Sequence, residues 1–327
     1  MSDRRHDEAR AFLARAGRSG APLAPLAGDA SARRYFRLPG GAVLMDADPA
    51  KGERVERFLA VGGWLLDHGY SAPKILARDE ARGFLLLEDL GDALFARVAA
   101  ADPAMEAPLY GAAVDFLADL AQQAPPPFVA AGDGPALARL VTLLNDHYLP
   151  ALDAPPLRAL PGLIAALYEE WNDLPPVLSL RDFHAENLIW LPERHGVRRA
   201  GLLDFQDAFA THPAYDLVSL LQDARRDVSP RATEACYRAY LDLTGLDEHL
   251  FARVHALIGA QRALRILAVF AKLARADGKP YYLDHAPRVA GHLARSLAHP
   301  ALGPLAACVA REVPELTADR LERLRIG

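Results

Sequence analysis

The sequence predicts an α+β protein of two lobes, with a strand-rich amino-terminal lobe over residues 1–89 and a mostly helical carboxy-terminal lobe over residues 90–327. Two observations lead to this prediction. Short apolar runs separated by glycine-containing turns fill the first lobe, whereas apolar residues at helical spacing fill most of the second. A chain of 327 residues is also long enough to bury a sizeable core.

The first lobe is expected to contain a hairpin, two further strands and two helices. The hairpin is predicted by two apolar segments on either side of the turn Pro39-Gly40-Gly41. The second helix is predicted by apolar residues that recur at helical spacing after Gly52. In chain order, the predicted elements are a helix over 7–16, strands over 34–38 and 42–45, a helix over 52–67, and strands over 74–77 and 83–87.

A change of pattern follows the last of these strands. The segment from Glu88 to Asp92 is polar and contains Gly91. A buried strand that ends in such a crossing is typical of a hinge between two lobes. A plain surface turn is the alternative for these residues.

Most of the second lobe is predicted to be helical. Over residues 103–123, Leu109, Phe116 and Leu120 share one face, and the prolines from Pro125 end the helix. Further helices are expected near 135–148, 157–173, 213–225, 230–243, 248–275, 286–298 and 314–325. The only strands expected here flank two polar loops, over 177–180, 188–191 and 200–203.

Those two loops carry the chemistry of the chain. Asp182 is followed five positions later by Asn187, and Asp204 comes just past the short hairpin that 188–191 and 200–203 are expected to form. This pattern is typical of phosphoryl transfer from a metal-bound nucleotide, in which the protein mainly positions groups and neutralises charge. Asp182 could accept the proton of an attacking hydroxyl, and Asn187 and Asp204 could hold Mg²⁺ through oxygen. Surface acids in ordinary turns are the alternative.

Three segments resemble one superfamily. Leu-Arg-Asp-Phe-His-Ala-Glu-Asn-Leu at 180–188, with Asp-Phe-Gln at 204–206, is similar to the catalytic and metal-binding loops of the aminoglycoside phosphotransferase and choline kinase superfamily. The segment 212–217 resembles its Asp-Pro-x-x-Asp-Leu segment. The segment 28–37 resembles a narrower branch, the kinases that phosphorylate N-acetylmuramate and N-acetylglucosamine at carbon 1 during cell-wall sugar recycling. The resemblance covers nearly the whole chain.

The resemblance implies a protein-kinase-like fold that uses ATP and Mg²⁺. Such folds usually place a Lys or Arg on the strand at 43–46, where it pairs with the phosphates and with a helix Glu, but this chain has Val-Leu-Met-Asp there. Arg34, Arg37 or Lys51 could supply the charge instead. Glu53 or Glu56 would then be the helix carboxylate, and the alternative for Lys51 and both acids is a solvated helix start.

The nucleotide is expected to meet three parts of the chain. The small-residue loop 28–34 could close over phosphates with its N–H groups, which predicts contacts from Ser31 and Arg34. Arg33 is expected to face water, and a common linker is the alternative for this loop. The main chain of the hinge could hydrogen-bond the adenine edge, which predicts contacts at Glu88 and Leu90.

Two residues near the proposed base have more than one possible role. His184 matches a histidine common in phosphotransferase relatives and could hold the loop or contact the substrate. Asp216 could cap a helix, since it lies at a helix start. In relatives the matching Asp braces the catalytic loop, and we therefore expect a supporting role for Asp216.

The acceptor is predicted from a basic helix side that carries Arg262 and Arg265. An Arg can bind a carboxylate through two hydrogen bonds, which suits an acidic sugar such as N-acetylmuramate and does not suit a polycationic aminoglycoside. A solvated helix face is the alternative.

The sequence therefore predicts an ATP-dependent small-molecule kinase that acts on the anomeric hydroxyl of N-acetylmuramate and N-acetylglucosamine. An aminoglycoside, choline or homoserine-like acceptor is one alternative. The other is a catalytically silent nucleotide-binding module, against which Asp182, Asn187 and Asp204 argue.

Composition sets the remaining expectations. The net charge of −5 gives no reason to expect nucleic acid as a partner. The chain has no run of eighteen apolar residues and no apolar stretch near its amino terminus, which predicts no membrane span or signal peptide. Two cysteines exclude a disulfide scaffold. We expect a cytoplasmic monomer.

Overall fold

The computed structural model describes residues 3–26 and 33–325. The chain divides into two compact units. Unit 1 comprises Met1–Ala113 and Ala185–Asp207, and unit 2 comprises Val114–His184 and Ala208–Gly327. Unit 1 therefore includes a segment from the middle of the chain. The lobe boundary at residues 89 and 90 stays a prediction, because lobes and compact units are defined differently.

Unit 1 is built on a five-stranded sheet with the strand order β1-β2-β3-β5-β4. The predicted hairpin is confirmed as β2 and β3, which are antiparallel and end at the pair Leu38 and Ala42. Gly40 and Gly41 form its turn with φ angles of 79° and 70°, which glycine adopts without the steric cost of a side chain. The strands are β1 Ala24–Leu26, β2 Arg34–Leu38, β3 Ala42–Asp46, β4 Ile75–Asp79 and β5 Phe84–Glu88.

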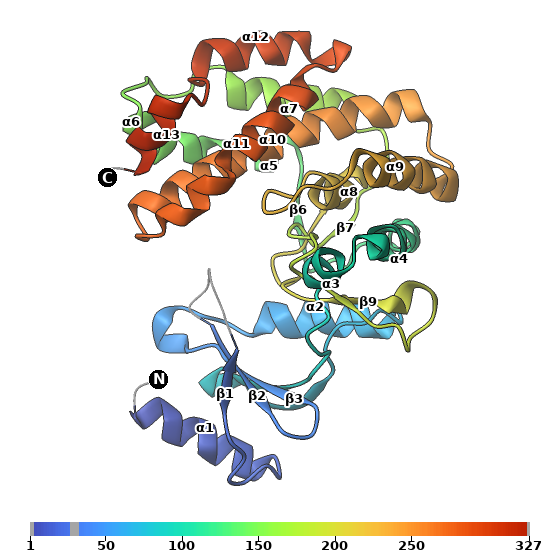
Figure 1. The fold of residues 1–327 in the computed structure, drawn as a ribbon, viewed down its shortest axis with the longest axis vertical. Helices are drawn as coiled ribbons and strands as arrows, with labels where there is room; N and C mark the ends of the chain where they lie inside the picture. Colours follow the sequence, from blue (N-terminus) through green and yellow to red (C-terminus); the bar gives the residue numbers. More distant parts are fainter. Residues whose placement is uncertain (1–2, 27–32, 326–327) are drawn as a thin grey trace. The chain divides into compact units, whose positions relative to one another are not determined.

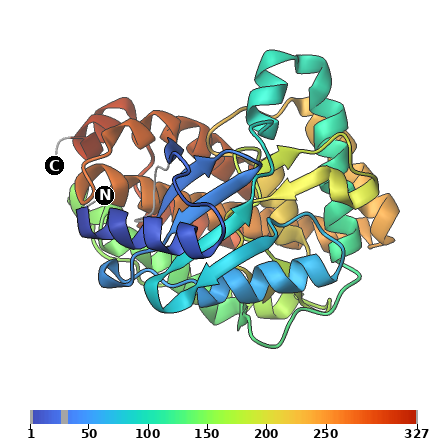
Figure 2. The same ribbon diagram turned by 90° about the horizontal axis from the view of Figure 1, so that it is seen from below.

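Two helices complete the core of unit 1. Helix α1, Asp3–Arg15, lies across the sheet (Figures 1 and 2), and its Phe12 stacks on Phe84 of β5 at 5.7 Å between ring centroids. Helix α2, Glu56–Asp67, carries Phe58, which stacks on Phe205 at 4.9 Å. The stacking joins α2 to the residue that follows Asp204, so the packing of this helix bears on the position of that loop.

The hairpin predicted between the polar loops is also confirmed. Strands β8, Leu188–Trp190, and β9, Ala200–Leu202, are antiparallel, with Leu188 opposite Leu202. The hairpin is tied to the rest of unit 1 by main-chain hydrogen bonds, from Trp190 N to Ala93 O at 2.7 Å and from Leu202 N to Ser71 O at 2.9 Å. These bonds explain why residues 185–207 belong to the amino-terminal unit.

Unit 2 is mostly helical and is organised around α10, Glu248–Arg275, which spans the predicted residues 248–275. Helices α5, α7, α8 and α11 pack against α10. The other helices of this unit include α9 and α12, and the carboxy-terminal α13 also contacts α10. The bounds are α5 Gly134–Val141, α6 Tyr148–Ala151, α7 Leu160–Trp171, α8 Ala214–Leu221, α9 Pro230–Thr244, α11 Ala286–Leu297, α12 Gly303–Glu312 and α13 Ala318–Arg325.

A small sheet in unit 2 leads into the first polar loop. Its order is β6-β10-β7, with β7 at Val177–Ser179, β10 at Phe209–Thr211 and β6 at Ala130–Ala131. Strand β7 is a confirmed prediction, but β6 and β10 were not predicted, because Ala-Ala and Phe-Ala-Thr contain no run of large apolar residues. Helix α3, Phe95–Ala101, and α12 were also missed. Helix α4, Glu106–Leu120, lies inside the predicted range.

One predicted helix is wrong as a continuous element. The range 135–148 is divided into α5, a 3₁₀ turn at Thr142–Asn145 and the start of α6. The 3₁₀ turn tightens the backbone, so the apolar face is preserved while the α-helical hydrogen bonding is broken.

The buried interior of unit 2 accounts for the long apolar stretch of α10. By length and hydropathy α10 could cross a membrane, but 78% of its most apolar window is buried inside the protein, as is typical of a core helix. Cys236 and Cys308 are both buried and form no disulfide among the described residues, as expected for small core residues.

Candidate active site

The predicted site residues are distributed over both units. Unit 2 contains Asp182, His184, Arg262 and Arg265. Unit 1 contains Arg34, Glu88, Leu90, Asn187 and Asp204. Ser31 lies outside the described residues, so its predicted phosphate contact stays a prediction.

In unit 2, a buried carboxylate holds the loop that carries Asp182. Asp216 of α8 is 3% exposed, and its oxygens accept hydrogen bonds from Ser179 Oγ at 2.7 Å, Leu180 N at 2.6 Å and Arg181 N at 3.0 Å. Helix α8 begins after Pro213 without a side-chain cap. The capping alternative is therefore wrong, and the supporting role expected for Asp216 is confirmed.

The residue before Asp182 has a left-handed backbone. Arg181 has a φ of 69°, which costs a non-glycine residue roughly 1–2 kcal/mol. Its carbonyl oxygen accepts hydrogen bonds from Ser219 Oγ at 3.0 Å and from Arg262 Nη1 at 2.9 Å. With the bonds from its N–H to Asp216 and Ser179, both peptide groups of Arg181 are held in place. The backbone entering Asp182 is thereby fixed.

The charges around Asp182 favour its ionised form. Burial acts to raise the pKa of Asp182, but the positive charges of Arg265 and Arg262 outweigh burial and lower the pKa below its ordinary value. The side chain is half-buried. At neutral pH it is a carboxylate beside guanidinium groups, which is the protonation state that a proton acceptor requires.

His184 is neutral and accepts a hydrogen bond. Burial lowers the pKa of His184 and the positive charge of Arg225 lowers it further, and together they outweigh the negative charge of Asp223, which acts to raise it. Its Nε2 lies 3.0 Å from Arg225 Nη1. Since a guanidinium can only donate, Nε2 accepts and the ring proton is assigned to Nδ1. Contact between His184 and the substrate stays a prediction.

Arg262 is not on a solvated face. It is 5% exposed, donates to Ser219 Oγ at 2.6 Å in addition to the Arg181 carbonyl, and lies over the ring of Tyr215. The alternative of a solvated helix face is therefore wrong for Arg262. These contacts give Arg262 a role in holding the loop, while its contact with the acceptor, like that of Arg265, stays a prediction.

In unit 1, the β8–β9 hairpin brings the two expected metal ligands to one end. Asn187 precedes β8 and Asp204 follows β9, and Leu203 N donates to Asn187 O at 3.0 Å. Asp204 has a φ of 55°, and its Oδ1 accepts from Gln206 Nε2 at 2.7 Å. The exposed carboxylate and the neighbouring amide present hard oxygen donors, which fit Mg²⁺.

Few side chains of the described residues are placed to bind a metal ion. Among residues 3–26 and 33–325, no three His, Cys, Asp or Glu side chains gather as a metal site. Mg²⁺ usually keeps several waters and binds through one or two carboxylates together with substrate phosphates. One carboxylate and one amide are therefore compatible with a metal that arrives with a nucleotide.

The arginines near β2 are paired with acids. Arg34 Nη2 lies 2.5 Å from Asp46 Oδ2, and Arg5 Nε donates to Asp46 Oδ1 at 2.8 Å. Arg37 pairs with Asp89 at 2.7 Å and also with Asp92. Asp46 ends strand β3 and is fully buried, so the strand that lacks a cation places an acid between two arginines.

The prediction that Arg33 faces water is wrong. Its Nε lies 2.8 Å from Glu53 Oε2, and the two side chains are only 13% and 17% exposed. Burial raises the pKa of Tyr35 to about 12, the positive charge of Arg33 lowers it, and the negative charges of Asp204 and Glu53 raise it. Arg33, Tyr35, Glu53 and Asp204 therefore lie in one neighbourhood of unit 1.

The side chains of the predicted hinge residues Glu88 and Leu90 are already hydrogen-bonded or buried. Glu88 accepts from Arg194 Nη2 at 2.8 Å and from Lys74 N at 3.3 Å. Leu90 is buried, and Gly91 turns the chain with a φ of 90°. Glu88 N also donates to Lys74 O at 2.8 Å, so an adenine edge would meet the carbonyl of Glu88 or the main chain of Leu90, and this contact stays a prediction.

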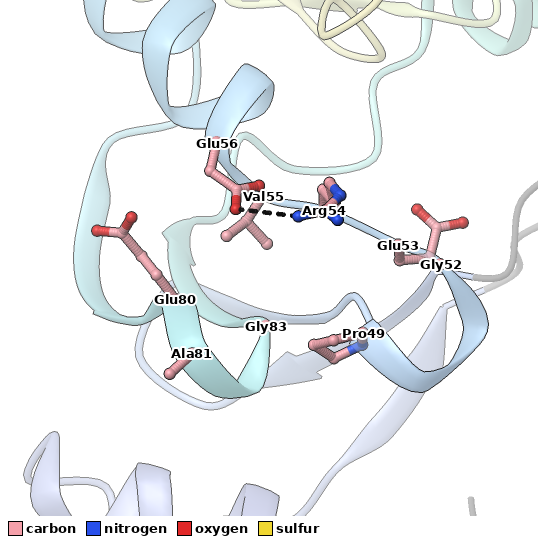
Figure 3. A pocket seen from close by; sticks show the side chains of 9 residues that line it. All are labelled: Pro49, Gly52, Glu53, Arg54, Val55, Glu56, Glu80, Ala81 and Gly83. Atoms are coloured by element: carbon pink, nitrogen blue, oxygen red, sulfur yellow. Dashed lines mark ion pairs between the residues drawn. The ribbon is translucent and has the colours of Figure 1, made fainter.

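A pocket of about 220 Å³ on unit 1 borders Glu53 (Figure 3). It is formed by the 3₁₀ turn Pro49–Lys51, the start of α2 and the 3₁₀ turn Glu80–Arg82. Glu53, Glu56 and Glu80 line it, and Arg54 pairs with Glu56 at 3.9 Å. The excess of carboxylates would repel phosphate groups, so we do not assign the nucleotide to this pocket.

Sequence reasoning missed several residues that the structure places beside the loop of Asp182. Ser219 could have been found, because it lies three positions after Asp216 on the same helix and so on the same side. Asp223 and Arg225 follow α8 in an irregular turn, and no periodic signal points to them. Their proximity to His184 depends on tertiary packing.

Comparison with known proteins agrees with this arrangement. The family model described as "Phosphotransferase enzyme family" matches residues 22–255. The chain is 40% identical to an N-acetylmuramate/N-acetylglucosamine kinase from Caulobacter vibrioides, with 96% of this chain and 98% of that protein covered.

Solved structures confirm the predicted protein-kinase-like fold. A choline/ethanolamine kinase family protein from Mesorhizobium loti matches with a TM-score of 0.61 and 19% identity, covering 99% of this chain and 100% of that one. The "streptomycin-ATP-APH(2'')-IIa ternary complex" matches with a TM-score of 0.56 and 15% identity, covering 82% and 90%. With its two polar loops, this fold and a family match over more than half of its length, the chain belongs to the phosphotransferase enzyme family.

Proposed function

We propose that this phosphotransferase moves the γ-phosphoryl group of ATP to the anomeric hydroxyl of N-acetylmuramate and N-acetylglucosamine. The acceptor is proposed from the printed name of the relative from Caulobacter vibrioides, which is similar over nearly the full length of both chains. ATP is proposed because a protein of the same fold is described in a ternary complex with it. Both ligands are small molecules, and we expect the enzyme to act as a cytoplasmic monomer.

The ionised state of Asp182 carries the proposal. Its pKa is lowered despite burial, because Arg265 and Arg262 stabilise the carboxylate. In the proposed step this carboxylate takes the proton of the anomeric hydroxyl while the sugar oxygen forms a bond to the γ-phosphorus. The bond from the γ-phosphorus to the β–γ bridging oxygen breaks, and ADP leaves with that electron pair.

The residues of unit 1 are proposed to hold the nucleotide. Asn187 and Asp204 would bind Mg²⁺, which when bound neutralises charge on the phosphate oxygens. Arg33, fixed by Glu53, is the cation that we place at the phosphates, because Tyr35 links it to the neighbourhood of Asp204.

The other nucleotide contacts follow the sequence predictions. Arg34 is the second candidate for a phosphate contact. It comes after Arg33 because its Nη2 already pairs with the buried Asp46. Ser31 is proposed to contact the phosphates as well. The main chain at Glu88 and Leu90 is proposed to meet the adenine.

The proposal is tested by identifying the product. The purified protein is incubated with ATP, Mg²⁺ and, in separate reactions, each amino sugar, an aminoglycoside and choline. We expect phosphorylation of both amino sugars at carbon 1, located by phosphorus–proton coupling in NMR spectra. Phosphorylation of the aminoglycoside or choline in place of the sugars would overturn the proposal.

A matched variant tests the base. Asp182→Asn keeps the size of the side chain but removes the proton acceptor, so kcat should fall by about 10²–10⁴-fold. ATP binding, followed by calorimetry, should change little because Asp182 is not proposed to hold the nucleotide. A variant with near-normal kcat would remove Asp182 from this role.

A further inference from the structure

A buried carboxylate near His184 has an oxygen without a partner. Asp223 lies just past α8 and is 2% exposed. Its Oδ1 accepts a hydrogen bond from Arg225 N at 2.8 Å, whereas its buried Oδ2 has no hydrogen-bond partner among the described residues. Leaving a buried acceptor unsatisfied costs about 1–3 kcal/mol. Such an atom calls for an explanation, and a bound donor would supply one.

The position of Asp223 relates it to the reaction. Its negative charge acts on His184, which lies two residues after Asp182 in the loop that Asp216 and Arg262 hold. On its other side, the carbonyl of Asp223 is 3.3 Å from His292 Nε2 of α11. Asp223 is therefore fixed between α11 and the loop of the proposed base, all within unit 2.

Arg225, two residues further on, shows the complementary feature. It is half-buried, and its side chain contacts the ring of His184. No carboxylate of the described residues lies within ion-pair distance of Arg225, whereas its neighbour Arg288 contacts both oxygens of Asp227 at 2.6 and 2.9 Å. The charge of Arg225 thus faces a neutral ring, and no carboxylate within residues 3–26 and 33–325 forms an ion pair with it.

We propose that Asp223 and Arg225 recognise the acceptor, an inference that rests on the proposed function. Asp223 Oδ2 accepts a hydrogen bond from a hydroxyl or amide N–H of the sugar, which both acceptors offer. Arg225 binds the carboxylate that only N-acetylmuramate has. Asp223 therefore contributes to both substrates, and Arg225 determines the preference for the acidic one.

His184 links this pair to the loop. Its Nε2 accepts from Arg225 Nη1, which positions the guanidinium without neutralising it. A carboxylate in place of the histidine would compete with the carboxylate of the substrate. His184 is thus a positioning residue in this scheme, and the neutral ring leaves the remaining N–H groups of Arg225 to the ligand.

The test measures kcat/KM for both sugars. Arg225→Gln should lower kcat/KM for N-acetylmuramate by about ten- to a hundred-fold, the effect of losing a charge-assisted hydrogen bond. The value for N-acetylglucosamine should stay within about three-fold, a difference of less than about 1 kcal/mol. The control is Arg238→Gln, the same change at an exposed arginine that pairs with Glu234 and Glu248, and it should leave both values unchanged.

Asp223→Asn gives the second arm. It keeps the shape of the side chain but replaces the carboxylate by an amide, so KM should rise for both sugars by a similar factor. If Arg225→Gln is poorly folded by circular dichroism, Arg225→Lys replaces it, since lysine keeps the charge but cannot bind the carboxylate with two parallel bonds. A partial loss of preference is then expected.

The outcomes separate this inference from the proposed function. A wild-type enzyme that phosphorylates neither sugar overturns the proposed function. An active wild type whose preference survives in both Arg225 variants overturns the inference alone. Loss of the preference in Arg262→Ala or Arg265→Ala instead, with Arg225→Gln unchanged, would assign the carboxylate to the basic side of α10 and would also overturn it.

Discussion

Arg33 Nε lies 2.8 Å from Glu53 Oε2, and this pair occurs in a protein whose β3 strand carries no basic residue. Glu53 lies just before α2, so the carboxylate comes from the region expected, while the cation comes from the chain just before β2. This protein therefore has a cation–carboxylate pair between the residue before β2 and the segment before α2. It has this pair although β3, the strand that usually supplies the cation, ends in the buried Asp46.

The first prediction concerns this pair. Arg33→Gln should lower kcat/KM for ATP by about ten- to a hundred-fold, because a charge-assisted hydrogen bond to phosphate is lost. The matched variant Arg34→Gln removes a partner of Asp46, so we expect it to reduce the free energy of unfolding more than it affects ATP. Steady-state kinetics with varied ATP and chemical denaturation distinguish the two. A larger effect of Arg34→Gln on ATP would reverse the assignment.

The second prediction concerns the metal ligands. Asp204→Ala should weaken Mg²⁺-dependent ATP binding more than Asn187→Ala does, because a carboxylate offers a full charge to the ion and an amide only a dipole. Titration calorimetry with ATP, with and without Mg²⁺, measures this difference. Equal and metal-independent binding by the wild type and Asp204→Ala would contradict the assignment.

The third prediction concerns the pH dependence of the proposed base. Burial acts to raise the pKa of Asp182, but nearby positive charges outweigh burial and lower the pKa, with the largest contribution from Arg265. Because the base must be deprotonated, activity should be present above this pKa and lost as the pH falls through it. In Arg265→Ala the pKa should rise, and the acidic limb of the kcat/KM profile should move to higher pH. An unshifted limb would show that another group controls it.

The fourth prediction concerns Asp216. Burial raises the pKa of Asp216 to about 6, although Ser179 and the N–H of Leu180 act in the opposite direction. A carboxyl whose pKa is raised on folding stabilises the protein at low pH, and this contribution is lost as the pH rises through the folded value. The free energy of unfolding of the wild type relative to Asp216→Asn should therefore fall between about pH 4 and pH 7. Denaturation of both proteins across this range measures it, and a constant difference would contradict the raised pKa.

The sequence was informative where patterns are long or where loops have a fixed spacing. The span of α10, the β2–β3 hairpin and the β8–β9 hairpin were all predicted, because periodicity and glycine-containing turns encode them locally. The role of Asp216 came from the resemblance, and three hydrogen bonds confirm it.

What could not be predicted depends on packing between distant segments. Strands β6 and β10 contain no run of large apolar residues, and each is stabilised by its neighbour in the sheet. Arg33 and Arg34 are adjacent in the chain, but Arg33 pairs with Glu53 and Arg34 pairs with Asp46. Only the structure shows which acid each arginine contacts. Asp223 and Arg225 lie in an irregular turn whose contact with His184 is set by the arrangement of α8 and the loop.

The left-handed backbone of Arg181 has a consequence for how this loop can diverge between related proteins. The bonds that hold it use the N–H and carbonyl of residue 181, which every amino acid except proline provides. Substitutions at position 181 are therefore limited first by which residues adopt a left-handed backbone, and only then by side-chain chemistry. Gly, Asn and Asp fit a φ of 69°, while β-branched residues are excluded. The identity of this residue can change through evolution while the path of the chain into Asp182 is inherited unchanged.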